Sequence, residues 1–376
     1  MMNMKKIIKT VLSLIKVSAA ALAAVMCLTG TQAVSEAVYD AAMRCLTVVI
    51  PSLYGMLMVS GFLIRSGILC NAPEFLSRIG RFLFGMDGSV FPIFIFSLFA
   101  GYPVGAKMLA AEADAGRLSK NDASLFAGVC FGAGPAFIFG CVASRLYGSS
   151  AAGSCILISN ISANIILAAA LSLKMRKKNI IRQKTSLTLT ADTLTRSILS
   201  AGRSMADICI TVTAFAVLSA LLRLCGAVEN IAQAISRFSG LDQDTAEGVI
   251  LSVLDVTAAG SMPENNYRLI PLLSALTAFG GICVMMQIAA VTKGRVSMRP
   301  VIFMRIAAAL ISGAVCRIIM PYMLSDEIIT ASAMSFSLHR SASPAPSVLL
   351  IIMTLLVFSE YDRISSSGKK SDRELS

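Results

Sequence analysis

Long apolar stretches separated by short polar segments dominate the hydrophobic pattern of this chain. After a first apolar helix within residues 1–28, further segments are long enough, or nearly so, to cross a bilayer, which takes roughly 20 helical residues. These segments are 44–66, 89–110, 124–144, 149–173, 206–226, 246–262, 269–292, 301–324 and 346–359. The pattern predicts an all-α, polytopic membrane protein whose first helix is retained rather than cleaved as a signal peptide.

Composition supports this class. The residues are 56% hydrophobic and 14% charged, and the mean hydropathy is +0.76, which is far more apolar than in soluble domains. The net charge of +12 comes from basic residues at the ends of apolar segments, as the positive-inside rule expects. We therefore expect a lipid bilayer as a partner and no nucleic acid. The cysteines form no CxxC pair and resemble small buried hydrophobes.

The charged loops predict that two segments do not cross the membrane. Lys5 and Lys6 and the basic run 174–184 should both be cytoplasmic, but an odd number of segments separates them. The charges of loop 65–88 favour the cytoplasmic side, and those of loop 227–247 favour the outside. The charges of all these loops fit the positive-inside rule if the segments 89–116 and 246–268 enter the membrane, turn and leave on the side they entered. The alternatives for the first segment are a Gly-Pro kink in a crossing helix and a GxxxG helix contact.

An internal repeat agrees with this topology. The segments 82–106 and 236–261 are similar, and one constant shift pairs Gly85 with Gly240 and Gly105 with Gly260. The first copy starts outside and the second starts inside, so their orientations are opposite. Inverted repeats with broken helices are typical of secondary transporters.

The predicted organisation has five parts. They are an N-terminal helix and linker at 1–41, a first gate-like repeat at 42–173, a basic cytoplasmic linker at 174–205, a second gate-like repeat at 206–324, and a loop, apolar helix and disordered tail at 325–376.

The candidate chemistry lies at the two hairpin tips. Lys107 follows the first tip, "GYPVG", near the start of the returning half-helix, where an ammonium beside backbone N–H groups makes an anion site. Snorkelling of Lys107 to the surface is the alternative. Asp255 at the second tip is a candidate for coupling to a proton or another cation, or for an ion pair with Arg223 or Lys107.

The spans that follow the hairpins are also interrupted, by Gly132, Gly134 and Pro135 in one and by two glycines in the other, and should face the tips. Asn160 and Asn164 are expected to form interhelical hydrogen bonds. The predicted substrate-binding residues are Gly101, Tyr102, Pro103, Gly105, Lys107, Gly134, Pro135, Asp255, Thr257, Gly260 and Gln287.

Motifs for catalysis are missing from the sequence. There is no GxxxxGK[ST] phosphate loop, no metal-ligand spacing, and no visible pair of nucleophile and base. We predict that the chain is not an enzyme and needs no metal or cofactor. No pattern predicts its oligomeric state.

The tip motifs resemble a known family. "AGYPVGAK" is similar to the SGFPxGAK motif and "CFGAGPAFIFG" to the NxGPxFIxG motif of YlbJ-like sporulation integral membrane proteins, in the nucleoside-recognition or gate-domain superfamily. "LDVTAAGS" resembles the second-half motif. Phe131-Gly132 stands where that family has an asparagine, and Asp255 where it usually has a glutamate.

The resemblance implies a transporter that moves dipicolinic acid, a small aromatic dianion, across the outer forespore membrane from the mother cell. The alternatives are a nucleoside or cation permease of the same superfamily, and a non-transporting membrane scaffold needed for the spore cortex. A scaffold should depend on its loops and tail rather than on the hairpin tips.

Overall fold

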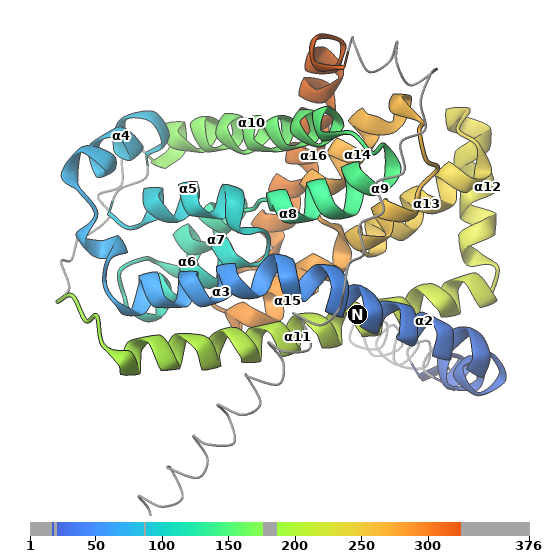
Figure 1. The fold of residues 1–376 in the computed structure, drawn as a ribbon, viewed down its shortest axis with the longest axis horizontal. Coiled ribbons are helices and arrows are strands. Elements are labelled where there is room, and N and C mark those ends of the chain that lie inside the picture. The colour runs from blue at the N-terminus through green and yellow to red at the C-terminus, as the bar shows by residue number, and fades with distance from the viewer. Residues whose placement is uncertain (1–16, 19–20, 86–87, 176–185, 325–376) are drawn as a thin grey trace, which may run out of the picture.

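The computed structural model describes residues 17–18, 21–85, 88–175 and 186–324, and its regular elements are all helical (Figure 1). Most of the predicted first helix, most of the basic run 174–184 and the whole segment 346–359 lie outside these residues. In chain order the main helices are α2 (Thr31–Arg44), α3 (Ile50–Arg65), α4 (Glu74–Phe84), α5 (Val90–Ala100), α6 (Val104–Asp114), α7 (Lys120–Ala127), α10 (Ser150–Met175), α11 (Ala191–Leu224), α12 (Ala227–Ser239), α13 (Gln243–Leu254), α14 (Ile270–Phe279), α15 (Gly281–Thr292) and α16 (Met298–Met323).

Within the part of the chain that the structure describes, five helical segments are long and apolar enough to cross a membrane. They are Thr31–Arg65, Ser150–Leu173, Ala191–Leu224, Tyr267–Thr292 and Met298–Met323, and Val90–Ala100 and Pro135–Leu146 are shorter apolar helices. The prediction of an all-α, multi-pass membrane protein is confirmed at this level.

The longest elements form an antiparallel pair that runs through the molecule (Figure 1). One is α2, the π-helical turn Cys45–Val49 and α3, which continue as a single rod. The other is α11, which starts well before the predicted residue 206 because the Thr190 side chain caps it by accepting from the Thr193 N–H. The Thr188 N–H donates to the Ser66 carbonyl, so α11 begins where α3 ends.

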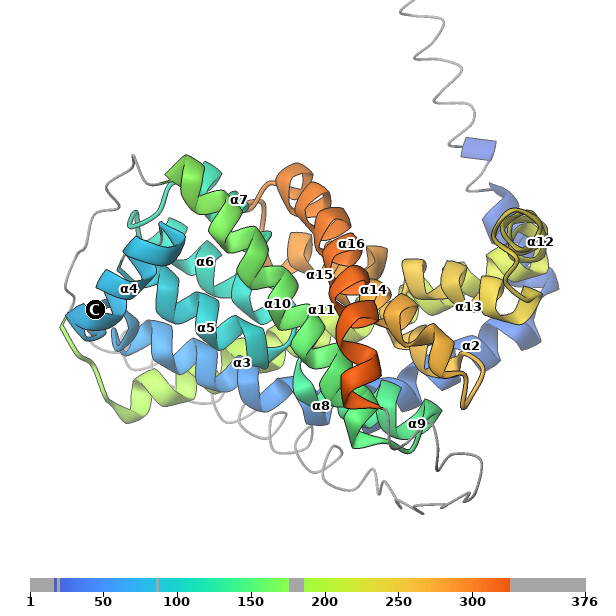
Figure 2. The same ribbon diagram turned by 90° about the horizontal axis from the view of Figure 1, so that it is seen from above.

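Helices α5 and α6 form a hairpin of two equal arms, which lie side by side in both views (Figures 1 and 2). The turn is Gly101-Tyr102-Pro103, with φ of +80° at Gly101, a region that glycine adopts without steric cost. At the open end, the buried Glu112 carboxylate accepts from the Ser89 hydroxyl and forms two hydrogen bonds with the Arg117 guanidinium. This base clamp fixes the arms at one end and leaves the tip in the protein interior.

Loss of the base clamp should destabilise the protein. Glu112 is 1% exposed and the Arg117 side chain 15% exposed, so Glu112→Ala leaves a partly buried cation unpaired. We expect a loss of about 2 kcal/mol in the free energy of unfolding, seen as a lower thermal midpoint in detergent. Asp114→Ala, on the same helix, breaks an ion pair with Arg295. The Arg295 and Asp114 side chains are 60% and 51% exposed, so this change should cost less than about 1 kcal/mol. Equal losses for the two variants would contradict the clamp.

The second hairpin differs from the prediction for 246–268. Helix α13 ends at Leu254, Asp255 is extended, and the return is only a short 3₁₀ helix, η4 (Val256–Ser261). Pro263 explains why the return limb is not a full helix, since proline lacks an N–H and keeps the preceding Met262 extended. The two tips are therefore built differently.

The two spans after the hairpins are broken as predicted. Residues 128–134 separate α7 from the short α8 (Pro135–Phe137), the π-helical turn η3 (Ile138–Ala143) and α9 (Ser144–Leu146). Helices α14 and α15 are separated at Gly280, where φ is +87°. Both breaks lie in the interior of the fold, where protein covers their backbone groups.

Candidate substrate site

Among the described residues, three cavities follow one another along α11 and the rod formed by α2 and α3. The first, here the Lys107 cavity, has a volume of about 690 Å³ and receives Arg65 from α3 and residues 196–207 from α11. The central cavity, of about 40 Å³, receives Leu53 from α3 and Ile208 and Val212 from α11. The third, the Arg44 cavity of about 560 Å³, receives Arg44 and residues 216–224 of α11. Both rods thus pass all three cavities, in opposite order along the chain because the rods are antiparallel.

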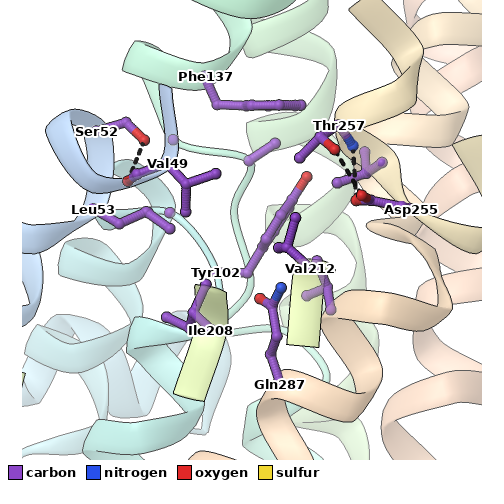
Figure 3. Close-up of a pocket in the computed structure, with 15 residues that line it drawn as sticks. Val49, Ser52, Leu53, Tyr102, Phe137, Ile208, Val212, Asp255, Thr257 and Gln287 are labelled. Carbon is purple, nitrogen blue, oxygen red and sulfur yellow. Dashed lines mark hydrogen bonds between the residues drawn. The ribbon is translucent and has the colours of Figure 1, made fainter. Parts of the chain in front are cut away.

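The central cavity is the point where the interrupted elements meet (Figure 3). Of the predicted substrate-binding residues, those that line it are Gly101, Tyr102, Gly134, Asp255, Thr257 and Gln287. They come from the first hairpin turn, the break before α8, the second tip and α15. Segments far apart in sequence therefore converge on one small space, as the repeat and the tip motifs predicted.

Close backbone contact explains the glycines of these segments. A Cβ added at Gly134 would lie 3.1 Å from the Gly101 Cα, so the first tip touches the break before α8. A Cβ at Gly281 would lie 3.0 Å from the Val256 N, so the second tip touches the break between α14 and α15. The predicted facing of tips and broken spans is confirmed by these contacts.

Pro103, Gly105, Pro135 and Gly260 support the central cavity but do not line it. Pro103 precedes α6 and Pro135 begins α8. Gly260 faces the Cys141 carbonyl, and Gly105 faces the Cys130 carbonyl and the Ser97 side chain. These four positions shape the backbone around the site.

Gly105→Ala is expected to disturb the hairpin, because the new methyl group meets the Cys130 carbonyl and lies 2.7 Å from the Ser97 Cβ. Overpacking of this kind costs about 1–3 kcal/mol and should lower the thermal midpoint in detergent. Gly55→Ala, in the middle of α3, is the matched control because nothing lies within 4 Å of its new Cβ. Its midpoint should stay or rise, since alanine favours helix. Equal destabilisation by both changes would contradict the close packing.

Asp255 is a buried carboxylate between two cavities. It is 5% exposed and lines both the central cavity and the Arg44 cavity. Its oxygens accept from the Thr257 N–H at 3.1 Å and from the Thr257 hydroxyl at 2.7 Å, which caps η4. Among the described residues it makes no ion pair, so the predicted pairs with Arg223 and Lys107 do not form. Hydrogen bonds therefore hold the carboxylate in place, but no cationic side chain among the described residues pairs with it directly.

Tyr102 and Gln287 bring further polar atoms to the central cavity. In Figure 3 the Tyr102 ring lies across the space with its hydroxyl toward Asp255 and Thr257. Tyr102 is 7% exposed, and its hydroxyl has no hydrogen-bond partner among the described residues. Among the described residues, the Gln287 Nε2 donates only to the Cys283 sulfur, at 3.4 Å. Buried polar atoms without good partners are costly, which favours a site that a polar solute or water completes.

Lys107 lies away from the tip residues. It lines the Lys107 cavity, and its ammonium donates to the Ser200 carbonyl of α11 at 3.3 Å. The cavity is rich in cations, because Arg65, Arg196, Arg203 and Lys293 also line it, against Asp114 and Asp207. Lys107 is thus part of a basic vestibule next to the central cavity.

Arg305 is a buried cation that the sequence analysis did not select. It lies in α16 and is 1% exposed. Its Nη2 donates to the Asn164 Oδ1 at 2.8 Å and its Nη1 to the Ala278 carbonyl at 3.3 Å. No described carboxylate pairs with it. The carbonyl end of the interrupted helix α14 supplies part of the missing negative charge. Its position inside an apolar segment was the available signal, since charges there are rare.

Arg305 connects to the central cavity through two rings. Its guanidinium carbon lies 4.6 Å from the centroid of the Phe131 ring, and Phe131 lies 4.8 Å from Tyr102, centroid to centroid. The Asn164 Nδ2 donates to the Phe131 carbonyl at 2.6 Å. The predicted interhelical role of Asn160 is also confirmed by hydrogen bonds with Thr277 and Ser312.

All ten cysteines are free in the structure, and seven of them are buried. The described residues contain no cluster of three or more His, Cys, Asp or Glu side chains suited to a metal ion. Comparison with protein-family models, with curated proteins and with solved structures finds no match. The function of this chain must therefore be inferred from its own residues and their geometry.

Proposed function

We propose that this chain is a secondary transporter of a small organic anion, with dipicolinate as the substrate and the outer forespore membrane as its location. The observation that carries the proposal is the series of cavities along α11. Arg196 lines the Lys107 cavity and Arg223 lines the Arg44 cavity, and at 1.5 Å per residue they are about 40 Å apart. This distance matches a bilayer with its headgroups. The two large cavities thus lie at opposite depths, with the interrupted elements between them.

Corresponding elements support two inverted repeats. An amphipathic helix that ends in a left-handed glycine precedes each tip, namely α4 with Gly85 and α12 with Gly240. The final helices, α10 and α16, are equally long. In this proposal α5 and α6 form a re-entrant hairpin, α13 and η4 its reduced counterpart, and rocking of one repeat against the other exposes the site to each side in turn.

The volume of the central cavity supports a closed state between two open ones. About 40 Å³ is far below the roughly 300 Å³ of the smallest common ligand pockets. A dianion therefore enters only after the tips separate. The cation-rich Lys107 cavity is the cytoplasmic vestibule under the positive-inside rule, and its positive potential raises the local concentration of anions.

Replacement of Lys107 tests the proposal. Spore and mother-cell dipicolinate would be measured in a spore-former that lacks its own family member and carries this gene or its Lys107→Ala version. We expect the wild-type gene to restore spore dipicolinate and the variant to leave most of it in the mother cell, because the vestibule loses a partly buried cation. Lys120→Ala, at the exposed start of α7, should behave like the wild type.

Two results would contradict the proposal. One is failure of the wild-type protein, although made and inserted, to restore spore dipicolinate together with no uptake of dipicolinate into proteoliposomes. The other is full restoration by Lys107→Ala, which would remove this cation from the substrate path.

A nucleoside or cation permease is the second candidate, and Asp255 is the observation that favours it. A buried carboxylate that lines the central cavity attracts a cation or hydrogen-bonds a neutral solute more readily than it accepts a dianion. Such a permease should tolerate Lys107→Ala. In the anion transporter, Asp255 instead holds a coupling cation, which lowers the repulsion of the substrate.

A further inference from the structure

Two charges of opposite sign flank the central cavity at different depths. Asp255 lines it directly, whereas Arg305 stands behind Phe131 and Tyr102. Neither charge has a partner of opposite charge among the described residues. In a low-dielectric interior a charge acts over several ångströms with little screening, so both contribute to the potential in the cavity.

We propose that Arg305 and the Tyr102 hydroxyl form the element that selects anions in the central cavity. This inference rests on the proposed anion transport and names the residues that set its specificity. The Tyr102 hydroxyl is buried, lines the cavity and has no partner, so its O–H is free to donate to a carboxylate of the solute. Arg305 acts through the rings, as a positioning residue that also supplies positive potential.

The contacts of Arg305 make its charge available to the cavity. Water and salt screen the charge of a surface arginine, and the carboxylate partner balances the charge of a paired arginine. Arg305 is 1% exposed, and its hydrogen-bond partners are the neutral oxygens of Asn164 and Ala278. Its Nε has no partner at all among the described residues. The positive charge is therefore compensated only by dipoles and by the face of Phe131.

The geometry also couples the charge to the position of Tyr102. Arg305 lies against the Phe131 ring, and this ring packs on Tyr102. The Asn164 amide accepts a hydrogen bond from Arg305 and donates one to the Phe131 carbonyl. A change at Arg305 should therefore affect anions in two ways, through the lost potential and through a displaced hydroxyl. A neutral solute of the same shape should respond much less to the lost potential.

The test compares two probes of the same shape in proteoliposomes. Dipicolinate is the dianion and pyridine-2,6-dicarboxamide its uncharged counterpart, and KM and kcat are measured for each. For Arg305→Met we expect the KM for dipicolinate to rise about tenfold, which corresponds to about 1.4 kcal/mol, while the KM for the diamide stays within about threefold. Arg305→Lys keeps the charge and should restore most of the preference for the dianion.

Tyr102→Phe tests the inference even if the Arg305 variants misfold. It removes only the unpartnered hydroxyl and leaves the Arg305 contacts in place, so it should also weaken dipicolinate uptake more than diamide uptake. The inference is overturned if the wild type transports dipicolinate and these variants keep its ratio of dianion to diamide. Uptake of the diamide but not of dipicolinate by the wild type, or of neither, overturns the proposed function itself.

Discussion

Asp255→Asn is expected to reduce dipicolinate uptake by at least about tenfold, which is an effect of about 1.4 kcal/mol or more on the transport barrier, without a large loss of stability. Asparagine keeps an oxygen that accepts from the Thr257 N–H, so the cap of η4 survives. The change removes the charge that lies between the central cavity and the Arg44 cavity. It also replaces the oxygen that accepts from the Thr257 hydroxyl with an NH2 group, which can donate to that hydroxyl instead. In the proposed transporter, the coupling cation loses its carboxylate ligand. Uptake into proteoliposomes and the thermal midpoint in detergent measure the two effects separately.

Asp242→Ala is the matched control for Asp255. Asp242 caps α13 and, like Asp255, accepts from the N–H and hydroxyl of a threonine, here Thr245. The Thr245 N–H lowers the pKa of Asp242, so this cap is charged at neutral pH. Its loss should cost about 1 kcal/mol of stability and leave uptake unchanged. Unimpaired transport by Asp255→Asn, or equal impairment by both variants, would contradict a specific role for Asp255.

The largest loss of stability is expected for Asn164→Leu. Asn164 is 3% exposed, accepts from the Arg305 Nη2 and donates to the Phe131 carbonyl. Leucine leaves a buried guanidinium with one carbonyl partner and a ring, and it orphans the Phe131 carbonyl. We expect a loss of about 3 kcal/mol, measured as a lower thermal midpoint in detergent.

Asn160→Leu, one turn earlier on the same face of α10, is the control. Its amide exchanges hydrogen bonds with Thr277 and Ser312, which are both neutral. Such bonds between membrane helices contribute about 1 kcal/mol. If both substitutions cost the same, the charge of Arg305 does not dominate the polar contacts between α10, α14 and α16.

The sequence predicted the features that depend on residues close together in the chain. Apolar length predicted the spanning helices, and Gly101, Gly134 and Gly280 predicted the breaks, because glycine permits both the turn and the close backbone contact. Asn160 and Asn164, one turn apart, predicted polar contacts on one helix face. Thr190 shows the limit of this approach, since its cap starts α11 earlier than hydropathy alone indicated.

Features that depend on side-chain direction were not predictable in this way. Lys107 is close to the first tip in sequence, but its side chain points to Ser200 on α11 and so enters the vestibule rather than the central cavity. The position of Arg305 inside an apolar segment of α16 marked an unusual charge but not its partners. Only the packing of α16 against α10 and α14 buries it, and that packing is a long-range property.

The small central cavity has a consequence for the cell that carries this protein. A water molecule occupies about 30 Å³ in the liquid, so about 40 Å³ admits little more than one. Among the described residues, the space between the Lys107 cavity and the Arg44 cavity is therefore too small for an ion with its full hydration shell. The proposed transporter in this conformation should therefore not leak hydrated ions across the membrane that carries it.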